Sequence, residues 1–224
     1  MKPYFPMFIR LEGRRGLIVG GGVVALRKIE KIAPYGASLR VIAPQILPEI
    51  EAMTDVERVK RCFRMSDLRA NWAFVIAATD DPQQNHVIAD QCSRRNIPVN
   101  VVDDPEFCSF IFPAVVHNGP FSVGISTGGA SPTAAIYFKE RLEAMVPERF
   151  DEILDWLSAQ RGAMKERIAD EQARAAVFKR MLSACMEKGV LCLTAKDKVR
   201  LLPALNIPME LLQKAVAIIK EACK

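Results

Sequence analysis

Residues 17–28 read LIVGGGVVALRK, and this stretch decides the fold. The apolar residues Leu17–Val19 are typical of the end of a buried parallel strand, and the three glycines that follow break it. A helical pattern of apolar residues begins after Gly22. Gly20, Gly22 and Ala25 therefore give G-x-G-x-x-A in the strand–turn–helix context that a dinucleotide fingerprint requires.

The positions in this turn have distinct physical roles. Gly20 permits the tight turn, Gly22 lets a pyrophosphate approach the backbone, and Ala25 lets the helix pack closely on the strand. The free amides and the dipole of the helix N-terminus favour a phosphate. An alternative interpretation is a glycine-rich strand–helix turn that holds no ligand. The cofactor contacts predicted in the turn are Gly20, Gly21, Gly22, Val23 and Val24.

The composition is that of an ordinary globular chain. Of the 224 residues, 50% are hydrophobic and 25% are charged, which suits one large domain or two to three small ones. No apolar run approaches the ~18 residues that span a bilayer, and the N-terminus lacks a signal-peptide pattern. The net charge of +5 is mild, without a basic block interleaved with aromatic residues. We expect a cytoplasmic protein that binds neither membrane nor nucleic acid.

The cysteines and histidines predict no metal site. The six cysteines show no C-x-x-C pairing, and without a secretion signal reduced thiols are the default. His86 and His117 do not lie at metal-ligand spacing from them.

The first hundred residues alternate strand-like and helix-like segments. Gly36 is placed to end the first helix, and Asp80 or Asp81 is placed to cap the third. The pattern predicts a Rossmann-like, doubly wound parallel sheet with a cofactor across the carboxyl ends of its strands. The strand candidates are 15–20, 38–43, 57–62, 72–78 and 97–102, and the helix candidates are 22–35, 45–53 and 81–95.

The pattern changes after this alternation. Apolar runs at 110–112 with 114–116, and at 121–125, flank the turn signal Asn118-Gly119-Pro120. They predict a hairpin outside the parallel sheet. A glycine loop at 126–131 then leads into a helix.

Helical spacing dominates from Glu148 onward, and a last helix is predicted from Pro208 to Cys223. We therefore expect three parts, which are residues 1–113, 114–147 and 148–224.

Candidate cofactor contacts lie at the ends of two of the predicted strands. Thr79 and Asp80 come after the strand that ends near residue 78, where a cofactor would lie, while Asp81 is either a ligand or a helix cap. Ala43 and Pro44 end the second strand. There the usual acidic residue for ribose hydroxyls is missing, as is an arginine for a 2′-phosphate, so the motif alone does not choose between NAD and NADP.

Asp103 and Asp104 follow the fifth predicted strand. Adjacent side chains on a strand point to opposite faces, so these two carboxylates do not form a dyad. One of them facing the cleft would act as a general base or orient a substrate. The alternative is a turn aspartate before Pro105.

The loop at residues 126–131 has the pattern of an anion-binding nest. Glycines before a helix N-terminus leave backbone amides available, and a second anion site beside a dinucleotide suggests an acidic substrate. Lys139 and Arg141 lie on the helix that follows, where a solvated face is the alternative role. The predicted substrate contacts are Ser126, Thr127, Gly128, Gly129 and Ser131, although Ser131 is equally suited to be an N-cap.

These motifs, taken in order, resemble the precorrin-2 dehydrogenase family, which includes the siroheme synthase N-terminal type and the sirohydrochlorin ferrochelatases. The resemblance covers residues 4–146 and is most specific in its last two blocks. The matching blocks are Pro6-Met7-Phe8, Val19–Lys28, Ala77–Asp81 with Asn85, Asn100–Asp103, Phe110–Ala114 and Ser126–Pro132.

The resemblance implies an NAD-dependent oxidoreductase that acts on CH–CH bonds and converts precorrin-2 to sirohydrochlorin in siroheme biosynthesis. It implies a homodimer whose residues 114–147 form the α+β dimerisation region, followed by a helical C-terminal region. The family's cleft aspartate falls on Asp103, for proton removal or substrate orientation. Insertion of Fe²⁺ into sirohydrochlorin stays open. The competing hypothesis is an NAD-sensing regulatory or ligand-gating module without catalysis.

Overall fold

The computed structural model describes residues 4–68, 71–188, 191–195 and 198–202. The described chain divides into two compact units. The first contains the residues up to Pro113 together with Thr127–Ser131, and the second contains Ala114–Ser126 and the residues from Pro132 onward.

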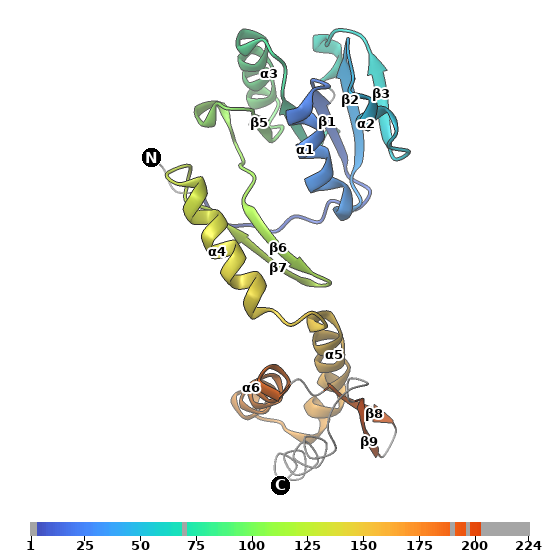
Figure 1. Cartoon of the computed structure of the whole chain (residues 1–224), viewed down its shortest axis with the longest axis vertical. Helices are drawn as coiled ribbons and strands as arrows, with labels where there is room; N and C mark the ends of the chain where they lie inside the picture. The colour runs from blue at the N-terminus through green and yellow to red at the C-terminus, as the bar shows by residue number, and fades with distance from the viewer. Residues whose placement is uncertain (1–3, 69–70, 189–190, 196–197, 203–224) are drawn as a thin grey trace. The chain divides into compact units, whose positions relative to one another are not determined.

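The first unit is built on a five-stranded parallel sheet with the strand order β3-β2-β1-β4-β5 (Figure 1). The strand order turns back at β1 and β4, which is the topological switch point where open α/β sheets bind ligands. The predicted doubly wound sheet is thus confirmed, with each strand within a few residues of its expected place. The strands are β1 (Arg15–Val19), β2 (Ser38–Ala43), β3 (Val56–Lys60), β4 (Phe74–Ala77) and β5 (Val99–Val101).

Two apolar clusters cover the two faces of this sheet. One joins alternate strand residues such as Leu17 and Val75 to Ile88 of α3, and the other joins Ile18 and Ile76 to Ile29 of α1. Both faces are buried, which explains the continuous apolar runs of the strands. The helices are α1 (Val23–Ile32), α2 (Pro48–Glu51) and α3 (Pro82–Arg94), and the 3₁₀ turns are η1 (Ala33–Tyr35), η2 (Met65–Asp67) and η3 (Pro105–Phe107).

The predicted helix ends are present. Gly36 has φ = +71° and follows η1, the 3₁₀ turn that continues α1. The Asp81 side chain accepts a hydrogen bond from Gln83 N at 2.9 Å, so Asp81 and not Asp80 caps α3.

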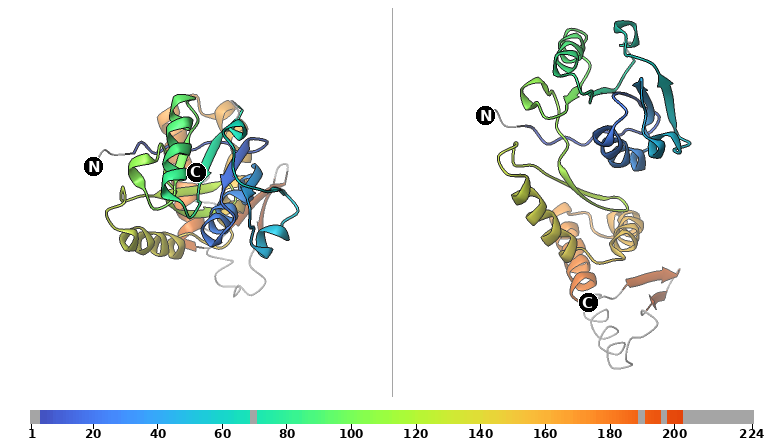
Figure 2. Two further views of the ribbon diagram at one scale, coloured as in Figure 1. Left: turned by 90° about the horizontal axis from the view of Figure 1, so that it is seen from above. Right: turned by 45° about the horizontal axis from the view of Figure 1, so that its top comes forward.

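The second unit begins with the predicted hairpin (Figure 2). Its strands are β6 (Ala114–Asn118) and β7 (Phe121–Ile125), with Gly119 at φ = +54° in the turn. Phe121 packs edge-on against Phe150 at 5.1 Å between ring centroids, and Asn118 bonds to Glu148 O and Asp151 N.

Helices follow the hairpin, as predicted. They are α4 (Pro132–Met145), α5 (Phe150–Arg167) and α6 (Glu171–Lys188). An antiparallel pair of strands, β8 (Leu191–Ala195) and β9 (Lys198–Leu202), comes after α6 and was not predicted. The helix expected from Pro208 to Cys223 lies outside the described residues. In the part of the chain that is described, none of the helices has the length and apolarity to cross a membrane.

The run at 110–112 is not a strand, contrary to the sequence-based expectation. Phe110 and Phe112 instead pack against the α1-side cluster of the first unit, and Phe110 O accepts a hydrogen bond from Asn100 Nδ2 at 3.0 Å. Apolar residues that pack singly into a core mimic the composition of a short strand, so composition alone does not separate the two.

Candidate functional site

The first two glycines of the turn after β1 are required by neighbouring backbone. Gly20 has φ = +122°, and a Cβ there would lie 2.0 Å from Ala78 O. A Cβ on Gly21 would lie 2.3 Å from Gln45 O. These contacts hold the turn between the loops that follow β2 and β4, at the carboxyl edge of the sheet.

Gly22 differs from its two neighbours. It has φ = −89°, and no described atom lies within 4 Å of a Cβ built on it. It is the N-cap of α1, and no described side chain caps the helix there. The first intrahelical bond is Leu26 N–H to Gly22 O, so the amides of Val23 and Val24 precede the helical ladder. An open backbone with available amides at a helix N-terminus fits a pyrophosphate.

The loop after β2 covers the other side of the turn. Leu47 N donates to Gly21 O at 2.9 Å, and the Ala43 Cβ lies 3.0 Å from where a Cβ of Gly21 would be. Ala43 is buried and Pro44 is exposed. The predicted contacts Ala43 and Pro44 are thus brought next to the glycine turn.

The predicted contacts after β4 are held by Asn85 of α3. The Thr79 hydroxyl donates to Asn85 Oδ1 at 2.7 Å, and Asn85 Nδ2 donates back to Thr79 O at 3.0 Å. Asn85 is buried and fixes the backbone at this strand end. Asp80 is exposed beside it.

Asp103 lies in a fixed turn after β5. It is exposed and has φ = +59°, a conformation that is uncommon outside glycine but tolerated by Asp and Asn. The Cys108 thiol bridges this turn. Its Sγ accepts a hydrogen bond from Val101 N at 3.1 Å and donates one to Asp104 O at 3.3 Å. Burial raises the pKa of Cys108, so the sulfur stays a protonated donor.

Asp104 does not share the site of Asp103. Its Oδ2 lies 2.7 Å from His86 Nε2, and the His86 ring stacks on Phe107 at 3.9 Å between centroids. The two carboxylates therefore have different surroundings, as the sequence predicted, and Asp104 ties its turn to α3.

Lys28 is a neighbour of Asp103 that sequence reasoning did not select. Its ammonium lies 4.1 Å from the centroid of the Phe112 ring. Burial and then the nearby Lys31 lower the pKa of Lys28, while Cys108 and Asp103 act in the opposite direction. Its helical position after the glycine turn was visible in the sequence, but the approach of Phe112 and Asp103 depends on the fold.

The second glycine loop closes largely on itself. The Thr127 hydroxyl accepts from Ser131 N at 3.1 Å and donates to Ser131 O at 3.0 Å, and Ala130 N donates to Thr127 O. Gly128 and Gly129 have φ = +64° and +91°. Residues 127–131 belong to the first unit and Ser126 to the second, so the predicted substrate contacts are divided between units.

Within the described residues, no group of three or more His, Cys, Asp and Glu side chains is placed to hold a metal ion. His117 lies on β6 of the second unit, whereas His86 lies on α3 of the first.

Comparison with known proteins shows what the chain is similar to. Residues 7–114 match a family described as putative NAD(P)-binding. A siroheme synthase from Thioalkalivibrio sulfidiphilus is 38% identical over 182 residues, which are 80% of this chain and 37% of the relative. One from Pseudomonas paraeruginosa is 37% identical over 202 residues, or 89% of this chain and 43% of the relative. The chain thus spans about two fifths of the length of these curated relatives.

The solved structure of SirC, described as a precorrin-2 dehydrogenase, has a TM-score of 0.61 to this chain at 23% identity. The match covers 96% of this chain and 100% of SirC, and it shows a shared fold. Residues 7–114 are therefore similar to the putative NAD(P)-binding family, and most of the chain is similar in sequence to siroheme synthases.

Proposed function

We propose that this chain oxidises precorrin-2 to sirohydrochlorin with NAD⁺ as the hydride acceptor, as a step in siroheme biosynthesis. The observation that carries the proposal is the open glycine turn at Gly22, placed at the carboxyl edge of the sheet in a relative of siroheme synthases. The proposal places the reaction in the cytoplasm, where the cysteines stay reduced.

The residues present fit a dinucleotide. The amides after Gly22 would hold the pyrophosphate, and Gly22 offers the space that a Cβ would fill. Ala43 and Pro44 would border the adenosine ribose, and Thr79 and Asp80 would border the half of the cofactor that crosses β4. Bound NAD⁺ would supply the hydride acceptor.

Asp103 is the proposed proton acceptor. Oxidation of a CH–CH unit removes a hydride and a proton, and the proton needs a base. The Asp103 carboxylate is exposed on a turn that Cys108 fixes, and the Lys28 ammonium lies nearby. In this proposal, a ring C–H bond breaks and its hydride goes to NAD⁺, while Asp103 takes the proton that the substrate loses.

The proposed substrate contacts are Ser126, Thr127, Gly128, Gly129 and Ser131. Precorrin-2 is a polycarboxylate, and a loop with consecutive positive-φ glycines before a helix suits an anionic group. The hydrogen bonds between Thr127 and Ser131 would fix the loop in this form.

We also propose a homodimer formed through the second unit. On α4 the side chains of Ile136, Tyr137, Phe138 and Met145 are 49–69% exposed, which is unusual for apolar groups on one helix of a monomer. Light scattering should give about twice the chain mass of 24.9 kDa. A monomer at micromolar concentration contradicts this part of the proposal.

The activity is tested anaerobically. Precorrin-2 generated in situ is mixed with the protein and NAD⁺, and the absorbance of NADH and sirohydrochlorin is followed. NAD-dependent sirohydrochlorin formation supports the proposal, and no turnover with NAD⁺ or NADP⁺ refutes it. Adding Fe²⁺ afterwards tests whether the same chain inserts metal faster than the reaction without enzyme.

A further inference from the structure

Two cations, Lys60 and Arg61, lie at the carboxyl end of β3, beside the strand end at which sheets of this topology recognise an adenosine ribose. In sheets of this topology that ribose lies beyond the end of β2, where an acidic residue marks NAD sites and an arginine marks NADP sites. Here β2 ends at Ala43 and is followed by Pro44, and neither residue provides an acidic or basic group. The neighbouring strand β3 supplies the charge, since Ala43 is in register with Lys60.

Lys60 belongs to the face of the sheet that bears the glycine turn. The Ala43 Cβ points toward Gly21, and side chains in register on parallel strands point to the same face. Val56 is four residues before Lys60 on β3, so both side chains point to the same face, and Val56 packs in the cluster on the α1 side. The Lys60 ammonium forms an ion pair of 2.6 Å with Glu51 Oε1, at the end of α2.

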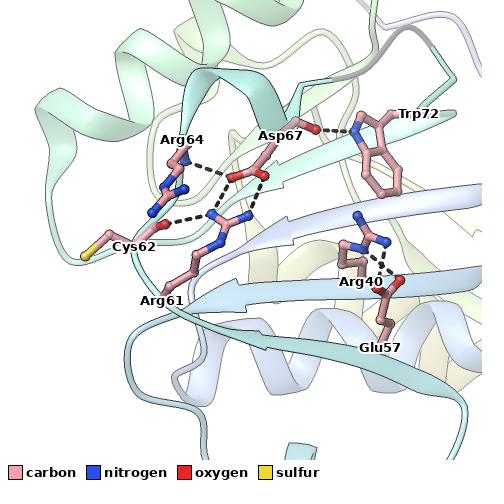
Figure 3. A network of polar contacts seen from close by, with 7 residues as sticks. All are labelled: Arg40, Glu57, Arg61, Cys62, Arg64, Asp67 and Trp72. Atoms are coloured by element: carbon pink, nitrogen blue, oxygen red, sulfur yellow. Dashed lines mark hydrogen bonds and ion pairs between the residues drawn. The ribbon is translucent and has the colours of Figure 1, made fainter.

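The next cation along the chain is held in a different way. Arg61 forms two hydrogen bonds with the buried Asp67 carboxylate, at 2.7 and 2.8 Å, and a third with Cys62 O (Figure 3). Asp67 Oδ2 also accepts from Arg64 N, and Asp67 O accepts from Trp72 Nε1. Separating a guanidinium from a partly buried carboxylate that it binds through both oxygens costs much free energy, so Arg61 stays paired with Asp67.

The Glu51–Lys60 pair is exposed by comparison. The Lys60 and Glu51 side chains have 60% and 39% of their surface accessible. Exposed pairs of this kind contribute little to stability, so removing the Glu51 charge should leave the fold intact. A cation on the cofactor side is therefore present, but a carboxylate neutralises it.

We infer that the Glu51–Lys60 pair sets the choice of dinucleotide: Glu51 neutralises Lys60 and disfavours the 2′-phosphate of NADP, so NAD is preferred. This inference rests on the proposed function, because it presumes that the glycine turn binds a dinucleotide. Glu51 is a specificity residue in this account and takes no part in the chemistry.

The test is calorimetric titration of the full chain with NAD⁺ and NADP⁺, which needs no turnover. Glu51→Gln keeps the shape of the side chain and removes its charge. It should raise the NADP⁺ affinity by about fivefold or more, as expected for a freed ammonium meeting a phosphate, and change the NAD⁺ affinity by less than about twofold. The double variant Glu51→Gln/Lys60→Gln should lose the gain.

The matched control is Glu57→Gln. Glu57 is an exposed carboxylate on β3, the strand that carries Lys60, but its side chain lies on the opposite face of the sheet. It pairs there with Arg40 (Figure 3). The substitution changes the net charge equally, so an unchanged ratio of NAD⁺ to NADP⁺ affinity there excludes a general charge effect.

The outcomes separate the inference from the proposed function. Wild-type protein that binds neither dinucleotide refutes both. Binding of NAD⁺ with an affinity ratio that Glu51→Gln leaves unchanged, or a gain that survives Lys60→Gln, refutes the inference alone. Wild-type preference for NADP⁺ refutes it as well.

Discussion

The chain contains two glycine loops that each precede a helix, and they are built differently. In the turn after β1, Gly20 and Gly21 are packed against backbone of neighbouring loops, and Gly22 is left open at the start of α1. In the loop at 127–131, Thr127 bonds to both Ala130 and Ser131, and both glycines have positive φ. No described atom lies within 4 Å of a Cβ built on Gly129. Similar sequence patterns thus give one turn locked by its surroundings and one locked by its own side chain.

The largest effect should come from adding a methyl group to the first loop, and the same change in the second loop should have a much smaller effect. Gly20→Ala places Cβ 2.0 Å from Ala78 O at φ = +122°, so we expect a loss of more than about 3 kcal/mol in unfolding free energy, or no folded protein. Gly129→Ala meets open space and should cost only about 1 kcal/mol of backbone strain. Denaturant unfolding measures both. Equal losses would show that the two loops are locked alike.

Gly22→Asp tests the open position of the first loop. The backbone there accepts a side chain, so the fold should persist while the new carboxylate faces the pyrophosphate. We expect NAD⁺ affinity to fall by about a hundredfold or more in calorimetry. Gly162→Asp, on α5 and also in open space, is the control for added charge. Unchanged NAD⁺ affinity in Gly22→Asp contradicts the assignment of the turn.

Asp103 and Asp104 allow a second comparison between neighbours. Asp103→Asn keeps a residue that tolerates φ = +59°, and it should lower turnover by about a hundredfold or more while NAD⁺ affinity stays nearly intact. Asp103→Ala should likewise lose turnover. Asp104→Asn removes the charge from the contact with His86 and should mainly reduce stability. Wild-type turnover in the Asp103 variants would show that Asp103 is not the proton acceptor and serves only the turn.

Thr127→Val should loosen the second loop without affecting the first. Valine has the shape of threonine but loses the bonds to Ser131, so the loop should hold an anionic substrate less well. We expect KM for precorrin-2 to rise by about threefold to tenfold with NAD⁺ affinity unchanged. Thr127→Ser keeps the hydroxyl and should restore KM. A change in NAD⁺ affinity would mean that the two loops are coupled.

The smallest effect concerns the Arg61–Asp67 pair, which is separate from both loops. The hydrogen bond from Arg61 lowers the pKa of Asp67 below its ordinary 3.8, outweighing the opposing effect of burial. A lowered pKa stabilises the fold above pH 3.8, and this contribution is lost as the pH falls through the folded pKa. The unfolding free energies of wild type and Asp67→Asn should differ most near neutral pH and converge in acid.

Much of the fold was predictable because local signals and burial agree. The apolar strands, the cap at Asp81 and the αL position at Gly36 each follow from chemistry within a few residues. The run at 110–112 misled because two aromatic rings that fill a core have the composition of a strand. The β8–β9 pair was missed, although residues 198–201 alternate polar and apolar side chains as a half-buried strand does.

The candidate site was predictable only where its residues are contiguous in the sequence. The glycine turn is a single stretch of chain, and its residues were found by motif. Lys28 and Cys108 were not selected, because they lie on α1 and after η3, and only the fold brings them near Asp103 at the end of β5. The Glu51–Lys60 pair likewise depends on the register of β2 with β3, which the sequence does not state.

The discontinuity of the first unit has a practical consequence for dissecting the protein. A fragment that stops at Pro113 lacks residues 127–131, which belong to the same unit. A fragment that stops at Ser131 keeps them, but it also keeps β6 and β7 without Phe150 and Asp151, to which the hairpin is bonded and packed. A stand-alone dinucleotide domain would therefore need the hairpin excised and Pro113 joined to Thr127 by a short synthetic linker.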